Sequence, residues 1–529
     1  MALGFVLMAV LGFQLARTAM PKAEVPKPTP DARGTAEWRT IENEPALKMR
    51  AGDRGEASPQ RDDEATLAGA LPNQRALLFA DGASLDAFLN NHGADVNVLG
   101  RMDGLHALRI SFDDPSILDD LDAESALIFP VYDPAPPEGT VQAGAAELGS
   151  SLLSWLGVEG DNAGWGAGVK VAVLDSGIAE HGTFTGAVSR INLVDLPSDG
   201  APQDGHGTAV ASVIAGSDPL TPGVSPGVEL ISIRIADETG FSDSYWLAEG
   251  ILAAVDAGAD LINISMGSLG DSLLVRRAIE QATARGALII AAAGNNGIGE
   301  VNFPAANEGV IGVGGVDASG EHLLFSNTGS GVDVSAPGFG INAAWPGEQG
   351  LSVSGTSFSA PIITGSLAAI MTHGATRRLS PLEAYDLLKT YANDAGDAGA
   401  DLALGIGMPD LGRVLNRNQP GIYDAAVGSS RLLAPGSAYP QGAVEVLVQN
   451  RGTETLVNTR VQVAVDGFTT TQNITTLAPN AVQSIRVPLR RTPDDGRGAV
   501  SLSTSVKTSS VTDTKPANNL RVQTYAPAK

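Results

Sequence analysis

The feature that most constrains this chain is a series of short runs, apolar on both faces, that alternate with helical stretches between residues 150 and 415. The helical stretches include "WLAEGILAAVDAGA" and "LLVRRAIEQATARG", and the apolar runs are "VKVAVLD", "ELISIRIAD", "DLINISMG", "ALIIAAAG" and "VIGVGGVD". Strands buried on both faces belong in a parallel sheet covered by helices. We therefore predict an α/β domain over 150–415, with its functional groups at the carboxyl ends of the strands.

The segments on either side of this domain have different patterns. Residues 74–133 predict a small α+β unit of order β-α-β-β-α-β, from "RALLFA", "SLDAFLNNHG", "ADVNVLG", "HALRISF", "DPSILDDLDA" and "ALIFPVY". Residues 420–529 change to a period of two, in "AVEVLVQN", "RVQVAVDG", "SIRVPL" and "AVSLSTSV", which predicts an antiparallel β-sandwich. The predicted fold class is thus α/β, with an α+β domain before the parallel-sheet domain and an all-β domain after it.

The N-terminus predicts export. Residues 1–16 carry no charged side chain, which suits an export signal, and the run is shorter than the roughly 20 residues of a spanning helix. We interpret residues 1–20 as a signal peptide, with an N-terminal membrane anchor as the alternative because Arg17 and Lys22 follow the apolar run and no basic residue precedes it. Residues 21–70 are rich in proline and charge, which predicts a disordered linker. The expected location is secreted, periplasmic or associated with the cell envelope.

Composition excludes several classes of function. The chain has no cysteine, which excludes disulfides, thiolate nucleophiles and thiolate zinc sites. Its formal net charge of −25 argues against a nucleic-acid partner, which would require a basic face. No acidic run has a ligand spacing that would assign metal-binding residues. A reactive group must therefore come from other side chains.

A candidate nucleophile lies in "SGTSFSAP", where Ser357 stands among small residues at the start of an apolar helix. Serine needs a base to remove its proton and a third group to hold that base. His206 lies between two glycines in "QDGHGTAVASVIAG", and Asp175 ends the apolar strand in "VKVAVLDSG". Taken singly, each residue also has a purely structural interpretation: Ser357 as a small polar residue where a helix begins, and Asp175 as a helix or turn cap.

A serine nucleophile also needs donors that stabilise the negative charge of a tetrahedral intermediate. The N–H of Ser357, at a helix start, is one candidate donor. "IIAAAGNNG" offers two side-chain amides, Asn295 and Asn296, at the end of a buried strand. A turn that tolerates positive φ is the alternative interpretation of these two residues.

Five motifs together, "VLDSG", "GHGTAVAS", "NISMGS", "AAAGNNG" and "SGTSFSAP", resemble the subtilisin-like serine proteases, the subtilases of peptidase family S8. The chain order Asp175, His206, Ser357 is that of subtilisin itself. The resemblance implies a serine endopeptidase in which Asp175 orients His206, His206 serves as base and then acid, and Ser357 attacks the peptide carbonyl. Asn295 would hold the oxyanion. Asn296 is the weaker candidate for this role, because it falls one position after the one that the family uses.

The same resemblance extends to binding residues and to the flanking domains. The cis proline of the family corresponds to Pro304, and the substrate-binding residues correspond to Ser265, Met266, Gly267, Ala292, Ala293 and Gly294. Residues 74–133 resemble the inhibitor-like propeptide of these zymogens, and 420–529 resemble an Ig-like, CARDB-like module. The implied partners are protein or peptide substrates and the chain's own propeptide; no cofactor is required, although structural Ca²⁺ is compatible with the family. The alternative function is a non-catalytic surface-binding protein on a subtilase scaffold.

Overall fold

The computed structural model describes residues 62–119, 121–133, 135–137, 140–142, 144–194, 204–237, 239–373, 377–492, 498–509 and 511–525. These residues belong to one compact unit. The expected signal peptide or anchor and most of the predicted linker lie outside them. None of the described helices combines the length and the hydropathy that a membrane span requires.

The centre of the molecule is a seven-stranded parallel sheet, as predicted, with strand order β15-β14-β13-β12-β6-β10-β7. All five predicted runs form strands of this sheet. Its strands are β6 (Lys170–Asp175), β7 (Val188–Asn192), β10 (Glu229–Arg234), β12 (Leu261–Ile264), β13 (Leu288–Ala292), β14 (Val310–Val316) and β15 (Val334–Pro337).

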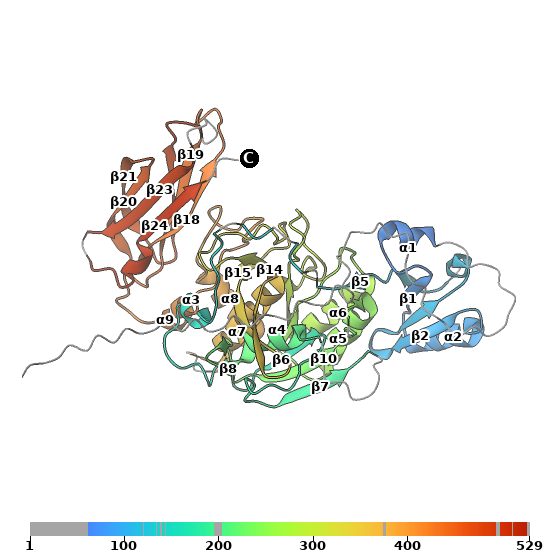
Figure 1. Cartoon of the computed structure of the whole chain (residues 1–529). Coiled ribbons are helices and arrows are strands. Elements are labelled where there is room, and N and C mark those ends of the chain that lie inside the picture. The colour runs from blue at the N-terminus through green and yellow to red at the C-terminus, as the bar shows by residue number, and fades with distance from the viewer. Residues whose placement is uncertain are drawn as a thin grey trace, which may run out of the picture. The chain divides into compact units, whose positions relative to one another are not determined.

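Helices cover both faces of this sheet (Figure 1). On β6, Val171 and Val173 join the core formed with helices α4 and α7, whereas Ala172 and Leu174 join the core formed with α5 and α6. This alternation explains why the strands are apolar on both faces. The helices of this domain are α3 (Leu152–Trp155), α4 (His206–Ala215), α5 (Ser244–Asp256), α6 (Leu273–Ala284), α7 (Thr356–Thr372), α8 (Pro381–Thr390) and α9 (Leu411–Asn416). Short antiparallel pairs add β8 (Ser217–Asp218) with β9 (Thr221–Pro222), and β16 (Ile341–Trp345) with β17 (Gln349–Val353).

The N-terminal unit is a four-stranded antiparallel sheet of order β2-β3-β1-β4. The predicted first helix forms and its C-cap is Gly93, but the predicted second helix is only the 3₁₀ turn η2. Asp119 and Asp122 follow that turn, and negative charge near a helix C-terminus opposes the helix dipole. The elements are β1 (Gln74–Leu78), α2 (Gly82–His92), β2 (Asn97–Met102), η1 (Asp103–Leu105), β3 (Ala107–Ser111), η2 (Pro115–Leu118) and β4 (Glu124–Ala126).

The final strand predicted for this unit is divided in two. β4 pairs with β1, whereas β5 (Pro130–Val131) pairs with β11 (Ser242–Asp243) of the parallel-sheet domain. Between them Phe129 packs so closely on Gly270 that a Cβ there would lie 2.0 Å from the aromatic ring. Pro130 also has no N–H to continue the first pairing. The chain therefore leaves its own sheet and enters the neighbouring domain.

The predicted linker ends earlier than residue 70. Helix α1 (Asp63–Ala68) begins at the N-cap Asp62, whose side chain accepts a hydrogen bond from the Ala65 N–H. Asp62 also forms a buried ion pair of 2.6 Å with Arg75 of β1. These contacts attach residues 62–69 to the N-terminal unit, so this part of the predicted linker is a helix.

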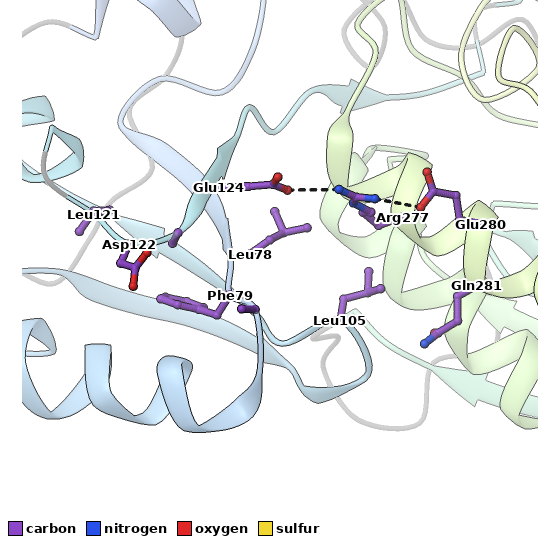
Figure 2. A pocket seen from close by; sticks show the side chains of 11 residues that line it. Leu78, Phe79, Leu105, Leu121, Asp122, Glu124, Arg277, Glu280 and Gln281 are labelled. Atoms are coloured by element: carbon purple, nitrogen blue, oxygen red, sulfur yellow. Dashed lines mark hydrogen bonds and ion pairs between the residues drawn. The ribbon is translucent and has the colours of Figure 1, made fainter.

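A cavity of about 820 Å³ lies where the N-terminal unit meets α6. Figure 2 shows Arg277 of α6 between two acidic side chains. Its guanidinium lies 3.5 Å from Glu124 of β4 and 3.1 Å from Glu280 of α6. Leu78 and Leu105 line the same cavity from the N-terminal unit.

The C-terminal region is all-β, as predicted, with one three-stranded and one four-stranded antiparallel sheet. Alternate residues such as Val444, Val446 and Val448 are buried in a core shared by both sheets. The strands are β18 (Ala425–Leu433), β19 (Ala443–Asn450), β20 (Leu456–Val465), β21 (Phe468–Leu477), β22 (Val482–Pro488), β23 (Val500–Thr508) and β24 (Leu520–Tyr525), with a 3₁₀ turn η3 (Pro516–Asn518).

Candidate active site

The four residues singled out from the sequence lie at the carboxyl edge of the parallel sheet. Asp175 is the last residue of β6, and His206 is the first residue of α4. Asn295 follows β13 by three positions, and Ser357 is the second residue of α7. In an open parallel sheet this edge gathers strand ends and helix starts, which explains how residues distant in sequence meet.

Asp175 and His206 form a closely packed pair. His206 Nδ1 lies 2.8 Å from Asp175 Oδ1 and 3.0 Å from Oδ2, and Asp175 is 1% exposed. Gly207 permits this approach, because a Cβ there would lie 2.4 Å from the Gly177 carbonyl oxygen and 3.1 Å from Asp175 Oδ1. The carboxylate therefore fixes the orientation of the imidazole ring.

A third carboxylate, that of Asp133, occupies the space in front of the serine. Its Oδ1 accepts a hydrogen bond of 2.5 Å from Ser357 Oγ, and its Oδ2 lies 3.0 Å from His206 Nε2. The same Oδ1 lies 3.4 Å from Asn295 Nδ2. One carboxylate thus meets the serine hydroxyl, the imidazole and the amide donor together.

The amide of Asn295 has a fixed orientation. Its Oδ1 accepts hydrogen bonds from the Thr356 N–H at 2.8 Å and from Thr356 Oγ1 at 2.9 Å. Its Nδ2 is therefore the group directed at Asp133. The adjacent Asn296 meets a different partner, since its backbone N–H donates to Asn327 Oδ1 at 3.0 Å.

The pKa of His206 is raised well above its usual value. Burial by itself opposes protonation of the ring, but the attraction of the Asp175 and Asp133 carboxylates outweighs it. The two carboxylates thus favour the protonated form of the ring, and a protonated imidazole cannot accept a proton from Ser357.

The chain that leads into Asp133 lies along the residues expected to bind substrate. Tyr132 and Gly267 form an antiparallel bridge, with N···O distances of 3.0 and 2.9 Å. Ser265, two positions earlier, donates its hydroxyl to the Ser357 carbonyl at 2.7 Å. On the other side, the Gly294 N–H donates to Thr356 Oγ1 at 3.2 Å. The remaining expected residues, Met266, Ala292 and Ala293, are buried in the same two segments.

Other expectations concern the surroundings of the site. The Phe303–Pro304 peptide bond is cis, as predicted. Among the described residues, no group of three His, Cys, Asp or Glu side chains is placed to hold a metal ion. Sequence reasoning missed Asp133 and the buried Asn302, which lies next to Gly267 and Gly294. The only sequence signal at Asp133 was its position at the end of an apolar run.

Comparisons with known proteins place the chain in one family. Residues 166–407 match the model of the subtilase family. Alkaline elastase YaB of Bacillus sp. (strain YaB) is 35% identical over 236 residues, which cover 44% of this chain and 61% of the elastase. Subtilisin DY of Bacillus licheniformis is 34% identical over 239 residues, covering 44% of this chain and 86% of that protein. Subtilisin Savinase of Lederbergia lenta is 35% identical over 209 residues, covering 39% of this chain and 77% of the relative.

Solved structures include similar chains as well. The protease domain of PatA aligns with 48% of this chain and 95% of its own, at 32% identity and a TM-score of 0.43. The sequence relatives define a class: serine-type endopeptidases, which are hydrolases of peptide bonds. This chain belongs to the subtilase family.

Proposed function

We propose that this chain is a serine endopeptidase, exported as a zymogen that processes itself. The observation that carries the proposal is the convergence of Ser357 Oγ, His206 Nε2 and Asn295 Nδ2 on one carboxylate, that of Asp133. The backbone bridge between Tyr132 and Gly267 brings this carboxylate there. The groups are those that a peptide carbonyl would need for acyl transfer.

In the proposed reaction, Ser357 Oγ attacks the carbonyl carbon of a peptide bond while His206 Nε2 takes the hydroxyl proton. Asp175 holds Nδ1–H and stabilises the imidazolium that forms. Asn295 Nδ2 and the Ser357 N–H stabilise the oxyanion, because their dipoles are fixed before the charge develops. The intermediate collapses as His206 protonates the leaving amine. A water molecule, deprotonated by His206, then hydrolyses the acyl-enzyme and regenerates Ser357. No cofactor enters this scheme.

The latent state of the proposed zymogen follows from Asp133. Residues 74–133 would act as the propeptide, and their last residue keeps His206 protonated and Ser357 engaged. Cleavage between Asp133 and Leu156 would then release the active enzyme. We assign the all-β region after residue 420 as an Ig-like, CARDB-like module, and residues 1–20 as the export signal or anchor. Proteins or peptides are the proposed substrates.

The test is covalent labelling of the purified full chain with a fluorophosphonate, followed by peptide mapping and intact-mass measurement. The wild type should shorten by loss of its N-terminal unit and then carry one adduct on Ser357. Ser357→Ala should stay at precursor length without an adduct. Ser359→Ala is the matched control, because Ser359 lies on the same helix and donates only to the Pro337 carbonyl. Equal shortening of wild type and Ser357→Ala, with no adduct, would favour the non-catalytic alternative.

A further inference from the structure

Asn302 lies between two segments, residues 265–267 and 292–294, that border the reacting groups. It is 4% exposed and lies against a glycine of each segment. A Cβ on Gly294 would lie 2.6 Å from Asn302 Nδ2, and a Cβ on Gly267 would lie 3.0 Å from Asn302 Cβ. The backbone is fixed too, because the Asn302 N–H donates to the Ala293 carbonyl at 3.0 Å.

The orientation of the Asn302 amide is set by its neighbour Asn327. Asn327 Oδ1 accepts backbone N–H bonds from Asn296 at 3.0 Å and Ile298 at 3.3 Å, so its Nδ2 must point the other way. That Nδ2 donates to Ala293 O at 3.2 Å and to Asn302 Oδ1 at 3.1 Å. Asn302 Oδ1 is therefore engaged, and the described residues supply no acceptor for Asn302 Nδ2. One side-chain donor is left facing the two glycines.

A substrate side chain next to the reacting carbonyl must enter this space. The carbonyl oxygen has to meet Asn295 Nδ2, and Asn295 directly follows Gly294. On the other side, the Ser265 hydroxyl donates to the Ser357 carbonyl, and Gly267 forms the backbone bridge with Tyr132. The residue that supplies the reacting carbonyl thus lies across both segments, with Asn302 at the end of its side chain.

We propose that Asn302 is the specificity-determining residue of this site, and that its Nδ2 selects peptides with asparagine or glutamine on the N-terminal side of the cleaved bond. The proposal rests on the function proposed above. An amide oxygen from the substrate completes the hydrogen bonding of Nδ2. A leucine side chain of nearly the same shape leaves this donor unpaired, which disfavours it.

The same donor disfavours the other classes of side chain. Lysine and arginine would bring a second donor against Nδ2. Aspartate and glutamate would bury a full negative charge, and the bordering segments, "SMG" and "AAG", contribute no cation to neutralise it. Phenylalanine, like leucine, offers no acceptor to Nδ2. Neutral amides supply the acceptor without burying a charge.

The test uses the self-processed enzyme and four peptide substrates that differ only in the residue before the cleaved bond: Asn, Leu, Asp and Ala. In the wild type, kcat/KM for Asn should exceed that for Leu by about tenfold, the size expected of one neutral hydrogen bond. Asn302→Ala should reduce this ratio to near one, with kcat/KM for Asn falling toward that for Ala. Asn302→Asp keeps the acceptor for Asn327 and so preserves the local fold; it should lower cleavage after Asp most, by charge repulsion.

Asn307→Ala serves as the matched control, because its amide lies five positions later and donates to Asp271. It should retain the wild-type ratio. The inference is overturned if wild type cleaves after Leu as fast as after Asn, or if Asn302→Ala keeps the wild-type ratio. Failure of the proposed function gives a different result, namely no cleavage of any substrate and no fluorophosphonate adduct on Ser357.

Discussion

Replacing Asp133 with asparagine removes the negative charge that holds the precursor latent and keeps the size of the side chain. In the structure Asp133 Oδ2 lies 3.0 Å from His206 Nε2, and the two side chains are 21% and 15% exposed. The pair is largely withdrawn from water, so it is not screened as a surface ion pair is. A hydrogen bond between charged groups in such a setting contributes about 1.5–3 kcal/mol.

This energy converts into a displacement of the His206 pKa. Asp133→Asn should therefore lower the pKa of His206 in the precursor. Since about 1.4 kcal/mol corresponds to a factor of ten, the neutral fraction of the ring should rise by about 10- to 100-fold at a pH where most rings are protonated. Asp175 remains, so the pKa does not fall to that of an isolated buried imidazole. In the wild-type precursor the raised pKa stabilises the docked state below about pH 6.5, and this stabilisation is lost as the pH rises through the raised value. The reactivity of Ser357 should therefore appear at lower pH in the variant.

The measurement is the rate of fluorophosphonate labelling as a function of pH, counting only adducts on chains of full precursor mass. The profile should move toward acid in Asp133→Asn, with labelling about 10- to 100-fold faster at a fixed pH on its rising limb. Asp113→Asn is the control, because Asp113 is an exposed residue of the same N-terminal unit. Coincident profiles for wild type and Asp133→Asn would refute the reasoning, as would an equal displacement in the control.

Two further predictions concern the oxyanion donor and the C-terminal region. Asn295→Ala should lower kcat by about 10²–10³, a magnitude known from subtilisin itself, and leave KM nearly unchanged. The measurement is steady-state kinetics after active-site titration, and a rise in KM without a fall in kcat would contradict the role of Asn295. In the C-terminal region, burial opposes ionisation of Glu445, but hydrogen bonds from Ser484, Arg486 and Arg431 outweigh it and lower the pKa of Glu445 to about 2. The depressed pKa adds stability above about pH 4.5 that is lost as the pH falls toward 2. Thermal unfolding should show this loss in wild type but not in Glu445→Gln.

The sequence allowed the parallel sheet to be predicted because each strand is buried on both faces, a pattern that few other folds produce. It also predicted where Asp175, His206 and Ser357 lie, because strand ends and helix starts share one edge. The division of the last strand of the N-terminal unit was not predictable, since Phe129 reaches Gly270 across more than a hundred residues. An isolated apolar run carries no information about which of two sheets each half will join.

Asp133 and Asn302 were missed for a related reason. Asp133 acts through a side chain that meets Ser357 only after one domain has docked against another. Asn302 acts through an amide orientation that Asn327 imposes from 25 positions away. Neither role leaves a local pattern, because both depend on contacts between segments that are far apart in sequence.

The roles proposed for Asp133 and Asn302 together predict where the precursor is cut. If Asn302 selects amide side chains, the bond cleaved between Asp133 and Leu156 should follow Gln142, because that segment contains no other Asn or Gln. In the precursor the Gln142 side chain instead donates to the His322 carbonyl at 2.8 Å, so the segment must rearrange before cleavage.

Gln142→Leu should therefore slow self-processing by about tenfold, for the loss of one neutral hydrogen bond, whereas Gln142→Asn should be processed. Thr140→Val, two positions earlier, is the control for general disturbance of the segment. N-terminal sequencing of the product and a time course of intact mass provide the readout. The decisive comparison is made in the Asn302→Ala background, where Gln142→Leu should have no further effect if the two side chains meet during cleavage. Additive slowing in the double variant, or a wild-type N-terminus other than Ala143, would show that Asn302 does not determine the processing site.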